Sequence, residues 1–519
     1  MISAPLPMRL GDLLRSAGVQ IAGVDGDPGV RIHGISTHAQ RTGRGEMFVA
    51  ISGTSFDSHV LLSEAVDAGA SVLLVEKESR PYPGVVTVRV PNTRAVLGKL
   101  AHALYGHPSR NMKVCGITGT NGKTTTTHLV REIMEQGGIK TAMIGTLGAY
   151  FGKVSMPTKN TTPDALELAE MMFVMEQEGV QAVAMEASSH AIDQGRLNGL
   201  RFRSCALTNL TQDHLDYHGT LANYAACKMR LFTDYLANSP GGQGCVNADD
   251  AVGRQLMETY TGDMISFSPS GDERAFVRGA DVQHTPRGIH FTLLIGGRTA
   301  PVRSTLMGSF NFANMLTAAG CAHSMGMDVE SIADALGKTR SVPGRFEYVD
   351  EGQPFSVIVD YAHTPDALER VLKTARRLCA GRLISVFGCG GDRDRGKRPI
   401  MGKAAGEASD FVIVTSDNPR TEDPQFIADQ IAEGLRKSPL KANRFHMVLD
   451  RHRAIDQAIN MACPGDVVLI AGKGHEDYQD FGTHRTHFDD REVAREVLRQ
   501  IIGNFSQSPI LEVPKEQHT

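Results

Sequence analysis

The chain has 519 residues and 41% hydrophobic content, which is enough for about three domains of ~150 residues. Its formal charge of −4, without any block of like charges, argues against a dedicated nucleic-acid surface. The eight cysteines form no CxxC pair, and no run approaches the ~20 apolar residues of a membrane span. We therefore expect a cytoplasmic enzyme without disulfides or structural zinc, which binds neither nucleic acid nor membrane. We also expect it to be a monomer.

The first hundred or so residues are typical of a small α/β domain. Residues 45–51 and 70–76 are predicted strands, and residues 59–69 and 93–105 are predicted helices. The sequence Gly106-His107-Pro108 then provides a boundary.

The stretch 114–127, VCGITGTNGKTTTT, predicts a strand that closes at Cys115, a glycine-rich phosphate loop, and a helix that opens at Lys123. Ile117 stands where the strict GxxxxGK[ST] pattern has its first glycine, so the variant GxxGxxGKT fits instead. Lys123 is expected to reach the β- and γ-phosphates of a nucleotide, and the hydroxyl of Thr124 to ligate magnesium. The alternative is a glycine-rich turn without a ligand.

Two apolar segments of the central region, 180–185 and 205–207, are predicted strands with polar residues at their ends. Glu186 follows the first, and the run 208–216, TNLTQDHLD, follows the second. Ligands of open α/β sheets bind at the carboxyl ends of strands, so Glu186 and His214 are expected to converge on a metal beside the phosphate loop. Each taken alone could instead be a helix cap or a loop polar group. Lys228, in YAACKMRLF, is by its own pattern an ordinary helix-surface lysine.

After Val342-Pro343-Gly344-Arg345 the alternation of strand and helix begins again. Predicted strands cover 356–360, 383–387, 411–415 and 466–471, with a helix from Pro365. Polar runs again follow the strands, which predicts a third α/β domain with a largely parallel sheet and a site at its carboxyl edge.

Many motifs, in order, carry a family resemblance. They are GITGTNGKTT, NTTPD, MEASSHAIDQGR, TNLTQDHLDYHG, YAACKMRLF, GSFNFANMLTA, VPGRFE, VDYAHTPDAL, FGCGGDRDRGKRP, SDNPRTEDP and AGKGHEDYQ. The sequence resembles the Mur ligase family of peptidoglycan synthesis, and within it the branch that adds the third residue of the stem peptide. The resemblance covers nearly the whole chain.

The resemblance implies an α/β fold of three domains. An N-terminal domain (1–108) would bind the UDP substrate, a central P-loop domain (109–345) would bind ATP, and a C-terminal Rossmann-like domain (346–519) would bind the amino acid. With ATP and Mg²⁺, such enzymes phosphorylate the carboxylate of UDP-N-acetylmuramoyl-L-alanyl-D-glutamate. The amine of the incoming amino acid then attacks the acyl phosphate.

The resemblance also implies roles for individual residues. Those matched to catalysis are Lys123, Lys228 and His214, and those matched to metal binding are Thr124, Glu186, His214 and Lys228, with Lys228 carbamylated. Those matched to the nucleotide are Gly119, Thr120, Asn121, Gly122, Lys123, Thr124, Thr125, Asn311, Asn314, Arg345, Asp360 and His363. Those matched to the sugar-dipeptide are Asn160, Thr161, Thr162, Ser188, Gln194 and Arg196. Those matched to the amino acid are Arg393, Asp417, Asn418, Pro419, Arg420, Gly472 and Glu476.

The run Asp417-Asn418-Pro419-Arg420 bears on the choice of amino acid. The far end of meso-diaminopimelate carries an ammonium beside a carboxylate. Arg420 offers two parallel donors to that carboxylate, and Asp417, Asn418 and Glu476 can accept from the ammonium. L-lysine lacks the distal carboxylate and would leave the arginine unpaired, so we expect diaminopimelate as the substrate. The alternative is a proline turn that only caps the preceding strand.

The first domain departs from the family pattern. Relatives have Asp-Ser-Arg where this chain has His38-Ala39-Gln40, so a contact to the uracil ring is lost, and Gly53–Asp57 would carry more of the UDP binding. Two other classes remain open. A nucleotide-hydrolysing switch protein leaves the motifs SDNPRTEDP and GKGHEDYQ without a role. A folylpolyglutamate synthetase shares the loop and the carbamylated lysine but not the DNPR run.

Overall fold

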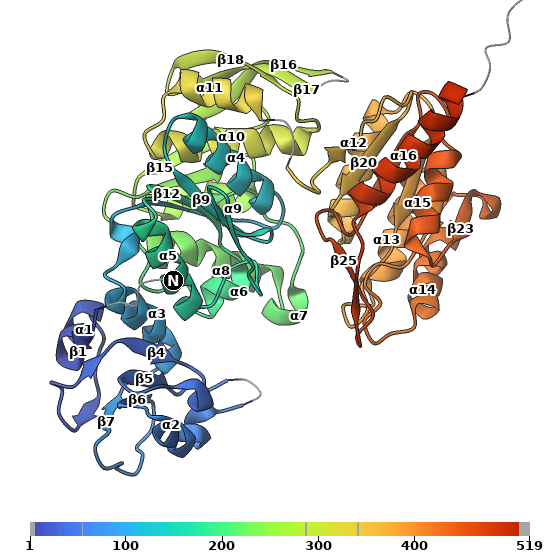
Figure 1. Cartoon of the computed structure of the whole chain (residues 1–519). Helices are drawn as coiled ribbons and strands as arrows, with labels where there is room; N and C mark the ends of the chain where they lie inside the picture. The colour runs from blue at the N-terminus through green and yellow to red at the C-terminus, as the bar shows by residue number, and fades with distance from the viewer. Residues whose placement is uncertain (1–5, 54–55, 286–287, 340–341, 508–519) are drawn as a thin grey trace, which may run out of the picture. The chain divides into compact units, whose positions relative to one another are not determined.

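The computed structural model describes residues 6–53, 56–285, 288–339 and 342–507 (Figure 1). The chain divides into two compact units. The first comprises residues 1–284, 289–304 and 310–339, and the second comprises 285–288, 305–309 and 340–519. Both units contain mainly parallel sheets that are flanked by helices, which confirms the predicted α/β class.

A five-stranded sheet of order β2-β7-β6-β5-β4 lies at the N-terminal end of the first unit. Its strands are β2 (Gly23–Asp25), β4 (Gly34–Ser36), β5 (Glu46–Val49), β6 (Val72–Val75) and β7 (Val86–Arg89). Only β2 is antiparallel to its neighbour. The helices beside it are α1 (Leu10–Ala17), α2 (Leu62–Ala68) and α3 (Thr93–Leu104), and β1 (Met8–Arg9) and β3 (Arg31–Ile32) form a separate antiparallel pair. The predicted helix over 59–69 begins as a 3₁₀ turn, Ser58–Leu61.

An eleven-stranded sheet forms the centre of the same unit, in the order β11-β10-β9-β12-β8-β13-β14-β15-β16-β17-β18. Its strands are β8 (Lys113–Thr118), β9 (Thr141–Gly145), β10 (Gly148–Phe151), β11 (Val154–Met156), β12 (Ala182–Glu186), β13 (Ser204–Leu207), β14 (Gln243–Asn247), β15 (Met264–Ser268), β16 (Val277–Thr285), β17 (Gly288–Ile295) and β18 (Arg298–Ser304). The neighbouring strands in the part of this order that runs β9-β12-β8-β13-β14-β15-β16 are all parallel. The antiparallel hairpins at both ends were not predicted from the sequence.

Helices pack on this sheet and connect its strands. They are α4 (Lys123–Gln136), α5 (Ala165–Gln177), α6 (Ser189–Asp193), α7 (Leu215–His218), α8 (Leu221–Arg230), α9 (Ala251–Thr259), α10 (Ser309–Ser324) and α11 (Val329–Lys338). Helix α8 runs directly into a π-helical segment, Leu231–Leu236. Such segments often lie at functional sites, and this one follows Lys228 by three residues.

The predicted end of the phosphate-loop strand at Cys115 is wrong, because β8 continues through Gly116 to Thr118. Gly116 pairs with Met185 of β12 and with Cys205 of β13, so it lies inside a central strand rather than in a turn. A Cβ atom there would come within 2.7 Å of the Phe202 ring, which explains the glycine. Glu186, expected just after a strand, is instead the last residue of β12.

The second unit contains a six-stranded sheet of order β19-β20-β24-β21-β22-β23. Its strands are β19 (Glu347–Tyr348), β20 (Ser356–Asp360), β21 (Leu383–Phe387), β22 (Phe411–Val414), β23 (Phe445–Met447) and β24 (Val467–Ala471). All neighbours except β19 and β20 are parallel, so the predicted largely parallel sheet is confirmed.

Helices cover both faces of this sheet, which is why its strands are apolar on both sides. One face carries α12 (Pro365–Leu378), α13 (Lys397–Ala408) and α14 (Pro424–Arg436), and the other carries α15 (Arg451–Asn460) and α16 (Asp490–Gln507). A hairpin of β25 (Tyr478–Asp480) and β26 (Arg485–His487) follows β24. Within the described residues, no helix is both long enough and apolar enough to span a bilayer.

Candidate active site

The predicted phosphate loop joins β8 to α4 and is held by a neighbouring segment. The backbone N–H of Thr120 donates to Asn209 O at 2.9 Å, and that of Asn121 donates to Asn209 Oδ1 at 3.1 Å. Gly119 and Gly122 have φ values of 144° and 85°, a region that favours glycine. Asn209, in the segment after β13, therefore holds the phosphate loop in place. The backbone N–H groups of this loop lie beside the N-terminus of α4.

Lys123, the first residue of α4, folds back over the loop. Its Nζ donates to the carbonyl oxygens of Gly119 and Thr120, both at 2.9 Å. Thr124 and Thr125 follow it and are buried. The ammonium thus lies within the loop that is predicted to hold phosphates.

Helix α10 brings Asn314 to this loop. A Cβ atom on Gly122 would lie 2.3 Å from Asn314 Oδ1, so the two residues touch only because Gly122 has no side chain. Asn314 Nδ2 also donates to Asn311 Oδ1 at 3.3 Å, and both asparagines are buried. The structure therefore joins two residues predicted to contact the nucleotide with the loop itself.

Lys228 is 1% exposed, so its sequence-based interpretation as a surface lysine is wrong. Its Nζ donates to Gly119 O at 2.9 Å and to Thr118 Oγ1 at 3.4 Å, and it lies 4.5 Å from the Tyr224 ring centroid. Burial, and then the charge of Lys123, hold the pKa of the Lys228 amine well below its usual range. The same carbonyl, Gly119 O, accepts from both lysines.

Glu186 lies at the carboxyl end of β12 and is 1% exposed. Its Oε1 accepts from the N–H of Thr146 at 2.8 Å, and its Oε2 accepts from the Thr146 hydroxyl at 3.2 Å. A Cβ atom on Gly145 would come within 2.3 Å of Oε1, so this glycine makes room for the carboxylate. Sequence analysis did not select Thr146, and no local motif marks it.

His214 directly precedes α7, with φ 50°, and its side chain is 45% exposed and lies 3.5 Å from Asp213 in their nearest N to O pair. Partial burial lowers the pKa of its imidazole; the charge of Asp213 opposes this shift, and the charges of Lys123 and Lys228 add to it. Around it lie the rings of His190, at 5.0 Å, and Tyr224, at 6.2 Å. These neighbours were not predicted.

The donors near the loop suit magnesium rather than a softer ion, because Thr124 supplies a hydroxyl and Glu186 a carboxylate. Magnesium often takes one or two protein oxygens and completes its shell with phosphates and water. Across the described residues, no group of three or more His, Cys, Asp or Glu side chains is arranged to hold a metal by itself. The residues therefore fit an ion that binds together with a nucleotide.

Four of the residues predicted to contact the sugar-dipeptide form one hydrogen-bonded group. Thr162 Oγ1 donates to Glu186 O at 2.8 Å and lies 3.3 Å from Ser188 Oγ. Arg196 donates to Thr162 O at 2.8 Å and holds Gln194 Oε1 through two N–H groups. Thr161 connects to the same region through Thr146 Oγ1 at 3.2 Å. Asn160 precedes them in the chain and is exposed.

The second unit holds its own candidate residues at the carboxyl edge of its sheet. Asp360 ends β20, and its carboxylate accepts from the N–H groups of Phe346 and Ala362, each at 2.7 Å. Burial raises the pKa of Asp360, although Arg345 and the two N–H groups oppose the shift. Arg345 stacks on the Tyr361 ring at 4.5 Å. His363 lies in the loop after β20, where its Nδ1 is 2.9 Å from Tyr361 O.

Asp417, Asn418 and Glu476, all predicted amino-acid contacts, meet around one buried side chain that sequence analysis did not select. The Lys473 ammonium is fully buried and lies 3.5 Å from Asp417 Oδ1, 3.1 Å from Asn418 Oδ1 and 3.4 Å from Glu476 Oε2. A Cβ atom on Gly472 would be 3.2 Å from Asp417 Oδ2. The motif GKGHED contains this lysine, but only the fold shows that its ammonium lies between the carboxylates of Asp417 and Glu476.

Arg420 has φ 53°, and its side chain donates to Gly391 O at 2.6 Å. A Cβ atom on Gly390 would come within 2.9 Å of Arg420 and 3.7 Å of Arg393, so this glycine lets both arginines approach one loop. The same loop passes close to Pro419, since a Cβ on Gly391 would lie 1.8 Å from Pro419 O. Every residue predicted to contact the amino acid therefore lies in one of three loops of the second unit, those that follow β21, β22 and β24.

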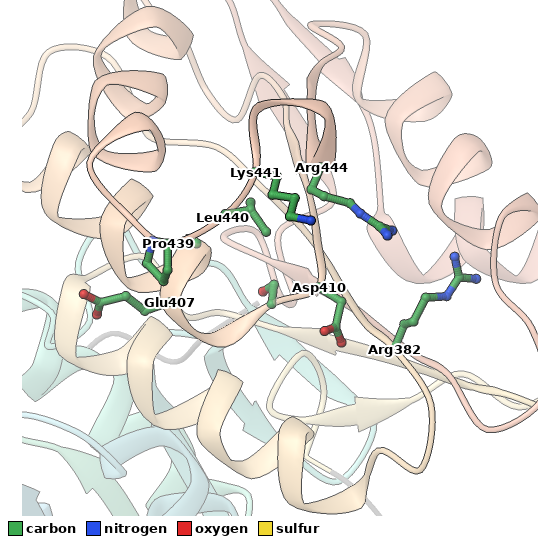
Figure 2. A pocket seen from close by; sticks show the side chains of 9 residues that line it. Arg382, Glu407, Asp410, Pro439, Leu440, Lys441 and Arg444 are labelled. Atoms are coloured by element: carbon green, nitrogen blue, oxygen red, sulfur yellow. The ribbon is translucent and has the colours of Figure 1, made fainter.

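A cavity of about 370 Å³ lies elsewhere in this unit, next to the starts of β21 and β22 (Figure 2). Its lining residues are Arg382, Gly406, Glu407, Ser409, Asp410, Pro439, Leu440, Lys441 and Arg444. None of these was predicted to have a role, and they border the amino edge of the sheet rather than the carboxyl edge.

Two family models match the chain. The Mur ligase middle domain matches residues 117–322, and the glutamate ligase domain of Mur ligases matches residues 344–474. The chain therefore belongs to the Mur ligase family.

Curated relatives give a narrower comparison. The UDP-N-acetylmuramoyl-L-alanyl-D-glutamate--2,6-diaminopimelate ligase of Geobacter sulfurreducens is 42% identical over 507 residues, with coverage of 95% of this chain and 99% of the relative. The enzyme of the same name from Gloeobacter violaceus is 43% identical, with 95% and 98% coverage. The predicted branch of the family, which adds the third stem-peptide residue, is thus the one that these relatives represent.

Solved structures agree with the fold. A structure titled as a UDP-N-acetylmuramoyl-L-alanyl-D-glutamate--2,6-diaminopimelate ligase matches with a TM-score of 0.69 and 32% identity, and covers 97% of this chain and 100% of its own. The MurF ligase of Thermotoga maritima in complex with ADP matches with a TM-score of 0.60 at 17% identity, and covers 91% and 98%, which shows the fold alone.

Proposed function

We propose that this protein is the ATP-dependent ligase that joins meso-diaminopimelate to UDP-N-acetylmuramoyl-L-alanyl-D-glutamate in the cytoplasm. The observation that carries the proposal is the pair of lysines, the partly buried Lys123 and the buried Lys228, which both donate to Gly119 O in the phosphate loop. Two cationic or modifiable amines beside such a loop are suited to phosphoryl transfer. The names of the relatives supply the substrates.

ATP would bind with its phosphates in the loop, and a Mur ligase that shares this fold is described with ADP. Thr124 and Glu186 are the residues that would hold Mg²⁺, together with His214, and the ion would neutralise phosphate charge. Asn311 and Asn314 would contact the nucleotide from α10. Arg345, Asp360 and His363 would contact it from the second unit.

The first chemical step would be attack of the D-glutamate side-chain carboxylate on the γ-phosphorus of ATP. The bond from this phosphorus to the bridging oxygen breaks, ADP leaves with the electron pair, and an acyl phosphate forms. Negative charge builds on the equatorial oxygens of the transferring group, so the Lys123 ammonium acts where that charge develops. Arg196, Gln194, Ser188 and Thr162 would hold the sugar-dipeptide so that its carboxylate points to the loop.

In the second step the free amine of diaminopimelate would attack the acyl carbon. A tetrahedral oxyanion forms and collapses, phosphate leaves, and the nitrogen loses a proton to give the amide. The amine must be neutral to attack, while the distal ammonium and carboxylate must stay charged for recognition. A site with acidic side chains and Arg420 suits that distal end.

Lys228 would act as a carbamate. Burial lowers the pKa of its amine and so favours the neutral form, which can add to CO₂ with loss of one proton and give a carbamate anion. That anion would be a metal ligand in addition to Thr124, Glu186 and His214. The burial of Lys228 thus favours the modification, because the neutral amine is the reactive form.

The division of work among three domains, 1–108, 109–345 and 346–519, remains a proposal. The segment of the first domain predicted to carry UDP binding, Gly53–Asp57, includes residues 54–55, which lie outside the described residues. The phosphate loop belongs to the first unit and the amino-acid residues belong to the second, so the proposed reaction would use residues of both units.

The test is phosphate release by the purified protein with ATP, Mg²⁺ and the UDP-muramoyl-dipeptide against a panel of amino acids. We expect turnover with meso-diaminopimelate and at least ~10³-fold lower kcat/KM with L-lysine, which lacks the distal carboxylate. D-glutamate, offered as the control amino acid, should give no turnover. Equal use of L-lysine would overturn the assignment of the amino acid, whereas phosphate release without any amino acid would overturn the ligase itself.

A further inference from the structure

Among the described residues, Lys473 is the only one whose side chain is hydrogen-bonded to the side chains of Asp417, Asn418 and Glu476 together. Its ammonium has three N–H donors, and the three oxygens that surround it account for all of them. The amine is therefore saturated and cannot act as a nucleophile or bind a substrate group directly.

Lys473, together with the Asp480 N–H, determines how the Asn418 amide is oriented. Asn418 Oδ1 accepts from Lys473 Nζ at 3.1 Å and from the Asp480 N–H at 3.0 Å, while Nδ2 donates to Glu476 Oε2 at 2.8 Å. A flipped amide would present its NH₂ group to an ammonium, so only one orientation is compatible with the lysine. Because both acceptor positions of Oδ1 are occupied, the amide carbonyl has no capacity left for a ligand.

The charges in this cluster do not cancel. One ammonium lies between two carboxylates, Asp417 and Glu476, and the adjacent buried pair of Arg451 and Asp490 is neutral in itself, with N to O distances of 2.7 Å. One negative charge is therefore in excess. The carboxylate oxygens that Lys473 does not contact are Asp417 Oδ2 and Glu476 Oε1, and Glu476 is the more exposed of the two side chains, at 18% against 9%.

We propose that Lys473 is a positioning residue for the amino-acid site: it pairs with Asp417, fixes the Asn418 amide, and leaves Glu476 as the surplus carboxylate that receives the distal ammonium of the incoming diamino acid. This inference rests on the proposed function. It adds a residue that touches neither substrate nor nucleotide but sets the charge and shape of the surface that does.

The pH dependence of binding follows from the groups that face Glu476. Burial raises the pKa of Glu476, the charge of Asp417 raises it further, and Lys473 opposes both. Arg451, Tyr361 and Tyr478 are the other charged or titratable neighbours. Without Lys473 the Glu476 carboxyl holds its proton to higher pH, and a protonated carboxyl binds an ammonium poorly.

The test is the variant Lys473→Met, with KM measured separately for diaminopimelate, ATP and the UDP-muramoyl-dipeptide. We expect the KM for diaminopimelate to rise about tenfold or more, and the other two to stay within about twofold. The ratio of the variant's KM for diaminopimelate to that of the wild type at the same pH should also fall as the pH rises, which a purely structural defect would not produce. Arg382→Met is the matched control, since Arg382 pairs with the buried Asp466 at the opposite edge of the same sheet and should change no KM.

A second pair of variants keeps the test decisive if Lys473→Met does not fold. Combining it with Glu476→Gln removes one negative charge together with the positive one, so the net charge of the cluster stays the same as in the wild type. In the Glu476→Gln background the lysine substitution should change the KM for diaminopimelate by about twofold or less, because the two residues act together. An equal factor in both backgrounds, or an equal rise of all three KM values, would overturn the proposal. Wild-type turnover with diaminopimelate is measured alongside, and its absence would refute the proposed function instead.

Discussion

Two fully buried lysines, Lys228 in the first unit and Lys473 in the second, lie in opposite electrostatic environments. Lys228 contacts a carbonyl, a hydroxyl and an aromatic ring, and within the described residues no carboxylate lies at salt-bridge distance from it. Lys473 lies between two carboxylates. Burial without a counter-charge favours the neutral amine, whereas a paired amine keeps its charge. The surroundings of Lys228 therefore suit a bound anion, and the surroundings of Lys473 suit a bound cation.

The largest effect that this contrast predicts is for Lys123→Ala. Removing the ammonium from the loop takes away charge neutralisation as phosphate is transferred, so kcat/KM should fall by about a thousandfold or more. Steady-state phosphate release measures it, and Lys338→Ala, an exposed lysine on α11, is the matched control. Comparable turnover in the Lys123 variant would show that the loop does not take part in catalysis.

A second substitution, Lys228→Ala, tests whether the uncompensated lysine really serves as an anion after modification. Activity should fall by about a hundredfold or more and should be partly restored by acetate, which supplies a carboxylate in place of the carbamate. Wild-type activity should fall when bicarbonate is removed. Full activity of the alanine variant in bicarbonate-free buffer would remove the carbamate from the mechanism.

The third change addresses the cation-accepting region. Arg420→Ala removes the donors expected to pair with the distal carboxylate of diaminopimelate, so its KM should rise by about a hundredfold. The KM for ATP should stay constant, since the loop that binds it belongs to the other unit. Initial rates at varied concentrations of each substrate separate the two. A matching increase in both KM values would mean that the substitution disturbs the fold.

The smallest effect is on stability in acid and concerns the carboxylate pairs of the second unit. Hydrogen bonds from Arg398, and then the N–H of Asp392 and nearby arginine charge, lower the pKa of Glu422 to about 2. A carboxyl group with a lowered pKa stabilises the fold at pH values above its ordinary pKa of about 4.5. This contribution is lost as the pH falls toward 2. Glu422→Gln should therefore lower the Tm by about 3 °C at neutral pH, and less below about pH 4.

Thermal unfolding across pH measures that difference. Glu433→Gln, an exposed position on α14, serves as the control and should leave the Tm unchanged. A constant difference between wild type and the Glu422 variant from pH 7 to about pH 3 would contradict the assignment of the stabilisation to this ion pair.

The sequence predicted the parallel strands well because those strands are buried on both sides and form short apolar runs between polar loops. The strands 356–360 and 383–387 agree with β20 and β21 to the residue. The end of β8 was missed because Gly116 was taken as a turn residue, whereas the Phe202 ring decides that position. The hairpin of β10 and β11 was missed because its strands are short, whereas β17 and β18 alternate between buried and more exposed residues, a signal that sequence analysis did not use.

Of the candidate site, motifs located the phosphate loop and the DNPR run, because those residue types have direct chemical roles. Lys228 required the family resemblance, since a lysine on a helix is usually exposed, and its burial depends on contacts far away in the chain. Thr146 and Lys473 were not found by either route. Each acts by holding another side chain, and such a role depends on three-dimensional proximity rather than on a local pattern.

The contact between Gly122 and Asn314 limits which point mutations the codon of residue 122 can tolerate. Every single-base change of a glycine codon that yields another amino acid gives one with a Cβ atom. At position 122 that atom would lie 2.3 Å from Asn314 Oδ1, on a backbone with φ 85° that such residues adopt only with strain. Any substitution of Gly122 is therefore expected to displace Asn314 or to distort the phosphate loop.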